Sequence, residues 1–303
     1  MIYKYWAFGV TISSTIEFPE LIPFDFDHAD VEIVLGRIPS SVKNGIFLET
    51  QRFSYRILDN ECIFEVKSVG RYYTSFGKFL VIEPFNESID LRLVRMNALG
   101  TAMASLLLQR KLFPMHASAV IKKDKVVLLM GESGAGKSTM FTKLIQRGNY
   151  AFSDDAIVLE AISDGKLNVQ ASYPMIRLWK ETLENLNDES LSNLAFQVKP
   201  DLDKYGVFFH NNFNTNKFEV SKIILLKKTI KDEITSVKLD GKNAFKEVSK
   251  HVFRPMLLQS LELKMISFKI IFNLTQTSEV YEVHRPDNCD PDNLVTYIEK
   301  LLL

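Results

Sequence analysis

The chain has 303 residues, of which 46% are hydrophobic and 24% charged, a composition typical of a globular protein with one large or two modest domains. Its 37 basic residues equal its 37 acidic residues, so no overall charge would attract nucleic acid or an anionic membrane surface. The only two cysteines, Cys62 and Cys289, are too few for a secreted disulfide framework or a structural zinc site. Polar residues between Thr11 and Glu17 interrupt any export core near the N-terminus. We therefore expect a cytoplasmic protein whose partners are neither nucleic acid nor a membrane.

Residues 1 to about 87 contain short runs that are rich in β-branched and aromatic residues and are separated by turn residues. The runs are YKYWAFGV, VEIVLG, IFLET, FSYRIL, CIFEV, RYYTSF and FLVIEPF. This pattern predicts a small β-rich N-terminal domain over 1–87. Between 88 and 112, apolar residues recur at helical spacing, which predicts an amphipathic packing helix that begins a second domain, 88–303.

After this helix the pattern alternates between strand and helix, which makes the predicted fold class α/β. MHASAVIKK and KVVLLM predict two strands joined by a turn at Lys123-Asp124. Gly148-Asn149 ends a helix predicted from about 137 to 147. Further strands are predicted in YAFSDDAIVLEA, KLNVQASY, FEVSKIILLKK and SEVYEVHRP, and further helices near 179–186, 244–251, 255–263 and 291–302.

The segment Gly131-Glu132-Ser133-Gly134-Ala135-Gly136-Lys137-Ser138-Thr139 satisfies the phosphate-loop pattern G-x-x-x-x-G-K-S/T. Glycines let backbone amides point inward at phosphate oxygens, and the helix that follows adds its positive N-terminal end. Lys137 would reach the β- and γ-phosphates of ATP, and the Ser138 hydroxyl would ligate the Mg²⁺ that bridges them. A strand predicted before the loop and a helix predicted after it favour nucleotide binding over a loop that binds no ligand.

A nucleotide loop needs a second acidic site, and Asp154 and Asp155 follow a predicted strand seventeen residues after Lys137. Adjacent carboxylates repel one another unless a cation or a proton lies between them. One could hold magnesium, for which Asp154 is the candidate, while the other accepts the proton of an attacking hydroxyl. The residues leave open which aspartate does which, and a turn or a helix cap would place the same pair there.

His116 lies on the strand that precedes the loop strand. A lone histidine on an apolar strand is more often a satisfied core residue than a catalyst. The combination with the loop and the aspartate pair makes it a candidate catalytic residue.

The segments HASAV, GESGAGKST and RGNYAFSDDAIVLE, in this order, resemble the HPr serine kinase superfamily. The resemblance implies a P-loop kinase core of the type found in HPr kinase and ATP-dependent phosphoenolpyruvate carboxykinase. It also implies transfer of the γ-phosphate of ATP to a serine hydroxyl of a protein. The matching site positions are His116, Lys137, Ser138, Asp154 and Asp155. The Glu-x-Arg-Gly-x-Gly segment that the bifunctional enzymes use for the reverse reaction is absent, which puts phosphorylase activity and HPr as the substrate in doubt.

Softer motifs, YWAFGVTISSTIEFPEL, VEIVLGRIP, YPMIRLW and HRPDN, are similar to the HPr-kinase-like proteins encoded beside lasso-peptide precursors. This resemblance implies that the partner is a peptide or small protein with an acceptor serine, at or near the C-terminus of such a precursor. It leaves a homo-oligomer open.

Three arginines, Arg177, Arg254 and Arg285, are candidates for binding a substrate phosphate or carboxylate, because a guanidinium suits both groups. The alternative for each is an ordinary surface arginine, which is the commoner case. Trp179 and Phe208-Phe209 could form an apolar lip for a peptide, or simply pack in the core.

Other function classes fit the loop less well. A GTPase needs Asn-Lys-x-Asp, and the nearest string, Asn216-Lys217-Phe218-Glu219, fails at its last position. An ABC-type ATPase needs Leu-Ser-Gly-Gly-Gln, which is absent. A kinase for a small metabolite, a carboxykinase-like enzyme, a nucleotide-hydrolysing switch and an ATP sensor stay as alternatives, since fold does not fix substrate.

Overall fold

The structure, a computed structural model, describes residues 1–39, 45–162, 165–185, 195–199 and 202–303. Its internal contacts divide the chain into two compact units, Met1–Pro114 with Phe253–Phe268, and Met115–Val252 with Lys269–Leu303. The units begin and end at other residues than the domains predicted over 1–87 and 88–303, and those domains stay a prediction. Helices and four sheets occur together in the described residues, so the mixed α/β class is confirmed.

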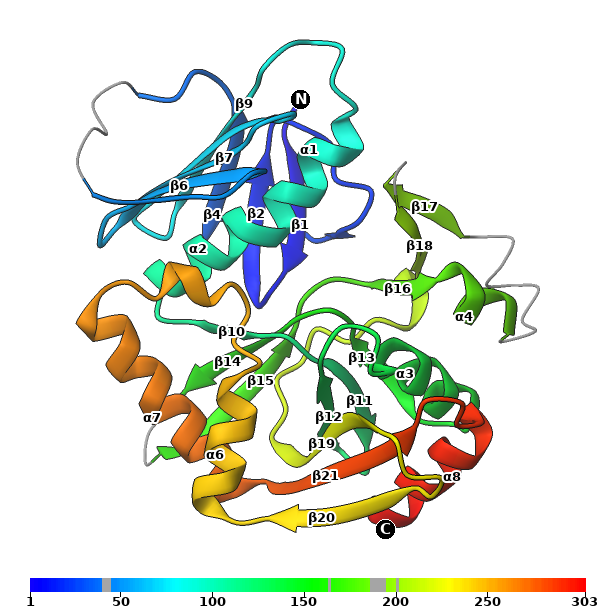
Figure 1. Ribbon diagram of the computed structural model, residues 1–303. Coiled ribbons are helices and arrows are strands. Elements are labelled where there is room, and N and C mark those ends of the chain that lie inside the picture. The colour runs from blue at the N-terminus through cyan, green and yellow to red at the C-terminus, as the bar shows by residue number, and fades with distance from the viewer. Residues whose placement is uncertain (40–44, 163–164, 186–194, 200–201) are drawn as a thin grey trace. The chain divides into compact units, whose positions relative to one another are not determined.

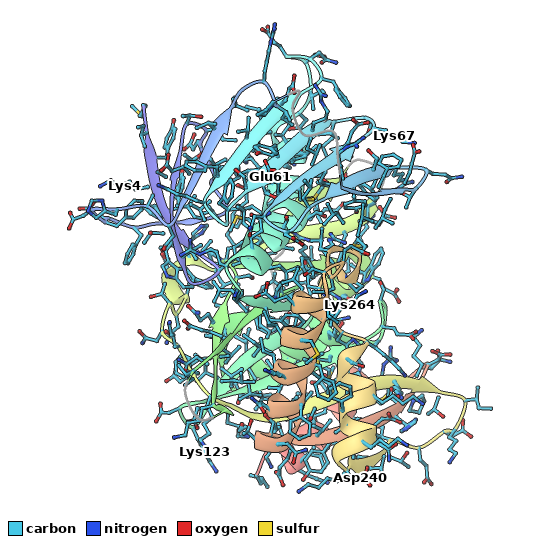
Figure 2. The ribbon with its side chains drawn as sticks, turned by 90° about the vertical axis from the view of Figure 1, so that its left-hand side faces the viewer. Lys4, Glu61, Lys67, Lys123, Asp240 and Lys264 are labelled. Atoms are coloured by element: carbon cyan, nitrogen blue, oxygen red, sulfur yellow. The ribbon has the colours of Figure 1, made fainter. Side chains whose placement is uncertain are left out.

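The first unit is built on a nine-stranded sheet with the order β3-β1-β2-β4-β9-β8-β7-β6-β5. Its strands are β1 (Tyr3–Ala7), β2 (Val10–Ser14), β3 (Ile22–Pro23), β4 (Val31–Leu35), β5 (Ile46–Glu49), β6 (Phe53–Ile57), β7 (Glu61–Val66), β8 (Gly70–Ser75) and β9 (Phe79–Pro84). The predicted strand runs are confirmed, except that the first run ends at a turn at Phe8 and Gly9, both of which have positive φ. Charged side chains such as Lys4 and Lys67 project outward from this sheet (Figure 2).

A helical segment packs against this sheet (Figure 1). It consists of α1 (Leu91–Asn97), a π-helical stretch (Ala98–Ala102) and α2 (Met103–Gln109). The Asp90 carboxylate accepts the N–H of Arg92 and thereby caps the start, which is why the helix begins later than the predicted residue 88. Within the described residues, Leu91–Gln109 is the one helix long and apolar enough to cross a membrane by those two criteria, and 61% of its most apolar window is buried inside the protein.

The second unit holds a six-stranded sheet with the order β13-β11-β12-β19-β21-β20. Its strands are β11 (Ser118–Lys122), β12 (Lys125–Gly131), β13 (Tyr150–Ser153), β19 (Val220–Thr229), β20 (Thr235–Leu239) and β21 (Glu279–Pro286). β12 is parallel to β19, and β19 is parallel to β21, whereas β11 runs antiparallel to both of its neighbours, β12 and β13. The carboxyl ends of β12, β13, β19 and β21 therefore meet the amino end of β11 at a single edge of the sheet.

Helices cover both faces of this sheet (Figure 1). They are α3 (Lys137–Gln146), α6 (Gly241–Ser249) and α8 (Pro291–Leu301). α3 and α8 lie side by side, and their buried Phe141 and Ile298 join a core with Ile224 of β19. Side chains alternate along a strand, so Lys227 points to the opposite face, where it pairs with Glu247 of α6 at 2.7 Å.

Two smaller sheets complete the strand structure. One includes β14 (Ile157–Ala161) and β15 (Leu167–Ala171), with β10 (Phe113–Met115); the other has the order β16-β18-β17, with β16 (Met175–Trp179), β17 (Phe196–Lys199) and β18 (Leu202–Phe208). β16 and β18 are antiparallel, so Trp179 lies opposite Lys204 and Arg177 opposite Gly206. A short helix, α4 (Lys180–Asn185), begins directly after β16.

Most elements predicted for the second half of the chain are confirmed, but the helix predicted over 255–263 is wrong. A 3-10 turn (Pro255–Leu257) is followed by a separate helix, α7 (Leu261–Thr277). The Ser260 hydroxyl accepts the N–H of Leu263, which starts the new helix, and apolar residues continue its core-facing side to Leu274. The helix predicted over 179–186 begins at Lys180, and Leu186 lies outside the described residues.

Candidate active site

The sheet edge at which β12 and β13 end brings the predicted site residues together. Ser118, the first residue of β11, lies opposite Leu129 of β12, and Ala119 lies opposite Ser153 of β13. Residues just before β11, just after β12 and just after β13 must therefore be neighbours. These are His116, the loop from Gly131 and the aspartate pair.

The loop between β12 and α3 has a backbone that only glycine adopts easily. Gly131, Gly134 and Gly136 have φ values of 153°, 81° and 102°. A Cβ at Gly131 would lie 2.5 Å from the carbonyl oxygen of Leu226, so a side chain there would push the loop away from β19. α3 begins at Lys137 immediately after the loop, and its first N–H groups and positive end make this a favourable place for a phosphate.

Lys137 is folded back over the loop and is only 8% exposed. Its ammonium donates to the carbonyl oxygens of Gly131 at 2.8 Å and Glu132 at 3.1 Å. Burial lowers the pKa of Lys137, and the nearby charge of Asp154 acts in the opposite direction. A buried cation beside a glycine-rich loop that leads into a helix N-terminus is suited to bind phosphate oxygens.

Asp154 is 3% exposed and accepts hydrogen bonds from three different elements. Its Oδ1 accepts from the Ser118 hydroxyl at 2.5 Å, and its two carboxylate oxygens accept from the Ser138 hydroxyl at 3.2 and 3.3 Å. Its Oδ2 also accepts the backbone N–H of Arg177 at 2.9 Å. Asp154 is thus a fixed hydrogen-bond acceptor in contact with the Ser138 hydroxyl.

Asp155 has different surroundings from its neighbour. Its backbone is in the left-handed region, with φ of 69°, which turns the side chain away from that of Asp154. Its Oδ2 accepts from Arg177 Nη1 at 2.8 Å, and its Oδ1 lies 3.7 Å from His116 Nδ1. The side chain is 22% exposed and lines a cavity, so a bound hydroxyl could reach it.

His116 is held by backbone groups. Its Nδ1 lies 2.7 Å from the carbonyl oxygen of Asp155, which requires Nδ1 to carry the proton and leaves Nε2 as the acceptor nitrogen of a neutral ring. Burial lowers the pKa of His116, although the charge of Asp155 raises it. The His116 backbone N–H donates to the carbonyl oxygen of His251 at 2.7 Å, which brings a second histidine close to the site.

Arg177 is bound to the aspartate pair. Besides Asp155, its guanidinium donates to the Tyr173 hydroxyl at 2.6 Å. Burial lowers the pKa of Arg177, but the charges of Asp155, Tyr173 and Asp154 outweigh burial and raise it, so this side chain stays cationic. Arg177 therefore orients Asp155.

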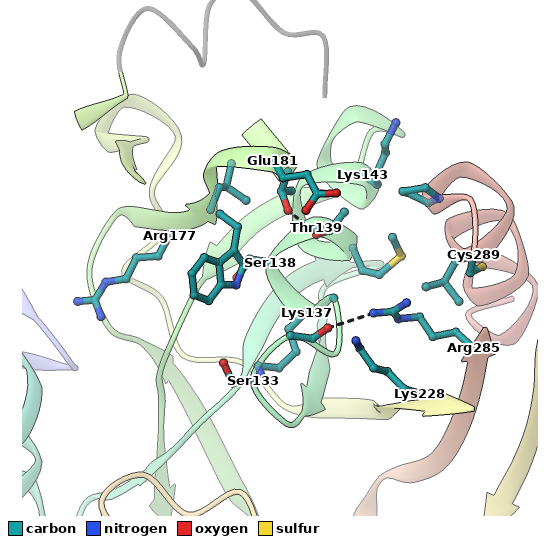
Figure 3. Close-up of a pocket in the computed structure, with 18 of the residues that line it drawn as sticks. Ser133, Lys137, Ser138, Thr139, Lys143, Arg177, Glu181, Lys228, Arg285 and Cys289 are labelled. Atoms are coloured by element: carbon teal, nitrogen blue, oxygen red, sulfur yellow. Dashed lines mark hydrogen bonds between the residues drawn. The ribbon is translucent and has the colours of Figure 1, made fainter. Parts of the chain in front are cut away.

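A cavity of about 680 Å³ opens at this edge, large enough for a nucleotide with part of a second substrate. Ser133, Gly134 and Gly136 to Thr139 line it together with His116, Asp154, Asp155, Arg177 and Arg285. Figure 3 shows Arg285 and Lys228 pointing toward the loop from the strands beside it. Gly131, Glu132 and Ala135 belong to the loop's backbone behind this lining.

Arg285 braces the loop from outside. Its Nε donates to the carbonyl oxygen of Ala135 at 2.9 Å, and its Nη2 donates to that of Gly134 at 3.0 Å. Its Nη1 donates to the carbonyl oxygens of Pro286 and Asp287. The arginine predicted as a substrate ligand thus holds the loop's curvature through backbone acceptors.

Arg254 belongs to the first unit, and its role in binding a substrate stays a prediction. It precedes Pro255 with a left-handed backbone, and its guanidinium lies over the ring of Phe253, 4.8 Å from the centroid. Trp179 lines the cavity and is 40% exposed, whereas Phe209 packs against the core of the second unit.

Magnesium fits the oxygen groups at Ser138 and Asp154. Within the described ranges, no group of three or more His, Cys, Asp or Glu side chains is arranged to hold a metal ion. Mg²⁺ normally takes one or two protein oxygens, with substrate phosphates and water completing the octahedron. The Ser138 hydroxyl and the Asp154 carboxylate, already in contact, are the oxygens that could serve it.

Two residues at the site were missed by sequence reasoning. His116, predicted to lie on a strand, instead precedes β11, and Ser118 within the HASAV motif is the first residue of that strand. On the predicted strand, alternation would have placed Ser118 on the same face as His116, so strand periodicity could have identified it. Lys204 lines the cavity from β18, a strand that no sequence pattern had predicted, and no local signal marks it.

No family model matches the chain. Over 72 residues it is 43% identical to two proteins named HPr kinase/phosphorylase, from Thermoanaerobacter sp. (strain X514) and Thermoanaerobacter pseudethanolicus (strain ATCC 33223 / 39E). This stretch is 23% of the chain and 23% of each relative, so the match spans less than a quarter of the length of these curated relatives. Among solved structures, the Hpr(Ser) kinase/phosphatase from Coxiella burnetii has a TM-score of 0.32 and 17% sequence identity, covering 62% of this chain and 93% of that chain. Similarity to HPr kinase/phosphorylases is therefore confirmed over a short stretch.

We predict that the protein becomes less stable as pH falls, because His251 must stay neutral in the folded state. Burial and then the charges of His116 and Lys137 lower the pKa of His251 to about 4. An unfolded histidine takes up a proton near its usual pKa of about 6.5, so the unfolded state binds more protons below that value and gains stability. For this one group the free energy of unfolding should fall by about 2 kcal/mol between roughly pH 7 and pH 5.

Urea denaturation at several pH values measures this dependence. His251→Gln should flatten it relative to the unchanged protein, while His28→Gln, at a solvent-exposed position, serves as the matched control. An equal pH slope with and without His251 would contradict the assignment.

Proposed function

We propose that the chain is an ATP-dependent serine kinase, which transfers the γ-phosphoryl group of ATP to a serine hydroxyl of a peptide or small protein. The observation that carries this proposal is the meeting of an anion-binding loop and two differently bonded aspartates at one cavity. Phosphoryl transfer needs little covalent chemistry from the protein. It needs a phosphate cradle, cations and a group that orients or deprotonates the acceptor.

The donor side of the proposed site consists of the loop, Lys137, Ser138 and Asp154. Backbone N–H groups of the loop and of the first turn of α3 would hold the phosphates, and Lys137 would exchange its carbonyl partners for phosphate oxygens. Bound Mg²⁺ would neutralise charge on the β- and γ-phosphates. Ser138 and Asp154 would hold this ion.

On the acceptor side we assign the role of base to Asp155. The serine oxygen forms a bond to the γ-phosphorus while the bond to the bridging oxygen breaks and ADP leaves with the electron pair. The serine proton passes to the Asp155 carboxylate, which Arg177 holds in place. Neutral His116, fixed by the Asp155 carbonyl, would present Nε2 toward the reacting groups as a positioning residue.

Similarity over 72 residues to proteins named HPr kinase/phosphorylase supports a kinase, and we extend it to a P-loop kinase core of the HPr kinase and phosphoenolpyruvate carboxykinase type. Without a Glu-x-Arg-Gly-x-Gly segment, transfer would run in one direction. We further propose that the acceptor is a lasso-peptide precursor, serine-phosphorylated in its C-terminal region, and that the β-rich segment 1–87 grips this peptide. The proposed setting is the cytoplasm, where ATP and magnesium are available, with no nucleic acid or membrane as partner.

The direct test is to incubate the purified protein with γ-labelled ATP, Mg²⁺ and short serine-containing peptides encoded near its gene. We expect label on a serine, identified by mass spectrometry, and no label on the matching Ser→Ala peptide. Label released only as orthophosphate, at equal rates with and without peptide, would replace the kinase by a nucleotide-hydrolysing switch. Label on a small metabolite alone would replace the peptide as the acceptor.

Substituting each of the two aspartates should affect the kinetics of phosphoryl transfer differently. Asp155→Asn should lower kcat by about a hundredfold or more while the affinity for ATP changes little, because it removes the base. Asp154→Asn should also lower the transfer rate more than ATP affinity, and in addition should raise the Mg²⁺ concentration needed for half-maximal rate.

Steady-state kinetics across a magnesium titration measure both effects, and thermal melting shows whether the buried substitution still folds. Asp232→Asn, at an exposed position of the same unit, is the control. Identical magnesium dependence in both site variants would refute the division of roles.

A further inference from the structure

Cationic side chains from outside the loop surround the cavity. They come from α3, β16, β18, β19 and β21, and are Lys143, Arg177, Lys204, Lys228 and Arg285. A cavity that receives a polyphosphate needs such charges, but a cation that a protein anion or carbonyl already holds is less available to a substrate. The partners of each cation therefore distinguish structural from functional roles.

Both arginines are held by groups of the protein. Arg177 donates to Asp155 and Tyr173. Arg285 donates to carbonyl oxygens of the loop at Gly134 and Ala135. Each orients a part of the site, and neither can turn to a ligand without releasing that part.

Two of the three lysines are also paired. Lys143 Nζ lies 3.0 Å from an Asp292 carboxylate oxygen, and Lys228 Nζ lies 3.0 Å from Asp287 Oδ1. Both pairs lie on the side of the cavity formed by α8 and the segment before it.

Lys204 is different. Its ammonium lies over the ring of Trp179, 5.6 Å from the centroid, and within the described part of the chain no carboxylate forms an ion pair with it. An aromatic face stabilises a cation without neutralising its charge. Lys204 thus keeps a full positive charge available to an anion in the cavity.

The pairing of β16 with β18 places Lys204 on the same sheet face as Arg177. Trp179 and Lys204 lie directly opposite each other in the register, so their side chains project from the same face of the sheet. Arg177, two residues before Trp179, projects from that face too and contacts Asp155. Lys204 consequently shares a sheet face with the side chain that holds the proposed base.

Lys204 and the loop lysine, Lys137, both line the cavity, Lys204 from β18 and Lys137 from the start of α3. Two ammonium groups that repel each other across a cavity are both stabilised when an anion enters between them.

We propose that Lys204 is a catalytic residue whose ammonium contacts an oxygen of the γ-phosphoryl group as it passes from ATP to the acceptor. This inference rests on the proposed kinase function. As the serine oxygen bonds to phosphorus and ADP departs with the electron pair, charge is spread over the three equatorial oxygens of the phosphoryl group. Lys137 binds this group from the loop side and Lys204 from the acceptor side, so their combined charge is greatest where the transition state needs it.

The test compares binding of Mg²⁺·ADP with binding of Mg²⁺·ADP plus aluminium fluoride, which imitates the phosphoryl group in transfer. Isothermal titration calorimetry measures both affinities for the unchanged protein, for Lys204→Gln and for the control Lys231→Ala, an exposed lysine outside the cavity. We expect aluminium fluoride to tighten ADP binding in the unchanged protein and in the control. Lys204→Gln should lose this gain by about tenfold to a hundredfold while binding Mg²⁺·ADP alone within about twofold.

Thermal melting of Lys204→Gln, and of Lys204→Arg as a second variant that keeps the charge, confirms that the fold is intact. If aluminium fluoride tightens ADP binding to Lys204→Gln as much as to the unchanged protein, the inference about Lys204 is wrong, while the proposed kinase function stands. A raised KM for the peptide acceptor in that variant would then indicate that Lys204 binds an acidic group of the acceptor. A gain absent from the unchanged protein would also overturn the inference. Failure of the unchanged protein to bind any nucleotide would instead overturn the proposed function.

Discussion

The buried carboxylate of Asp154 is the interaction on which the arrangement of the site depends. It accepts hydrogen bonds from Ser118 at the start of β11, from Ser138 in the first turn of α3, and from the backbone of Arg177 in β16. Burying a carboxylate costs several kcal/mol, and hydrogen bonds to a charged group return about 1.5–3 kcal/mol each. Three such bonds offset that cost only when all three elements are in place, so the carboxylate couples β11, the helix α3 and the strand β16.

From this centre the site divides into two halves with different chemistry. On one side the loop glycines, the start of α3 and Arg285 fix the backbone groups that we propose bind the phosphates. On the other, the left-handed turn at Asp155 directs its carboxylate to Arg177 and His116. Adjacent aspartates can therefore serve different functions, because backbone geometry separates their side chains and neighbouring groups assign each a partner.

The features of the site that depend on neighbouring residues in the chain could be predicted from the sequence. A glycine-rich pattern between a predicted strand and a predicted helix indicates a tightly curled loop, and Asp154 and Asp155 follow a strand that the sequence also predicts. The features that depend on contacts between residues distant in the sequence could not. The antiparallel position of β11, which makes His116 a neighbour of the loop, depends on strand pairing. Arg285 could not be recognised as a brace for the loop, since its acceptors are carbonyl groups 150 and 151 residues earlier in the chain. Lys204 became visible only through the register of β18 with β16.

In the proposed site, the loop and Asp154 together bind the phosphates and the metal ion. A crystal structure with Mg²⁺ and a non-hydrolysable ATP analogue tests it most directly. We expect phosphate oxygens on the backbone N–H groups between Gly134 and Thr139, with the ion on Ser138 Oγ and Asp154 bonded to it directly or through a water molecule. Phosphates bound elsewhere in the cavity, or an ion held without either residue, would contradict it.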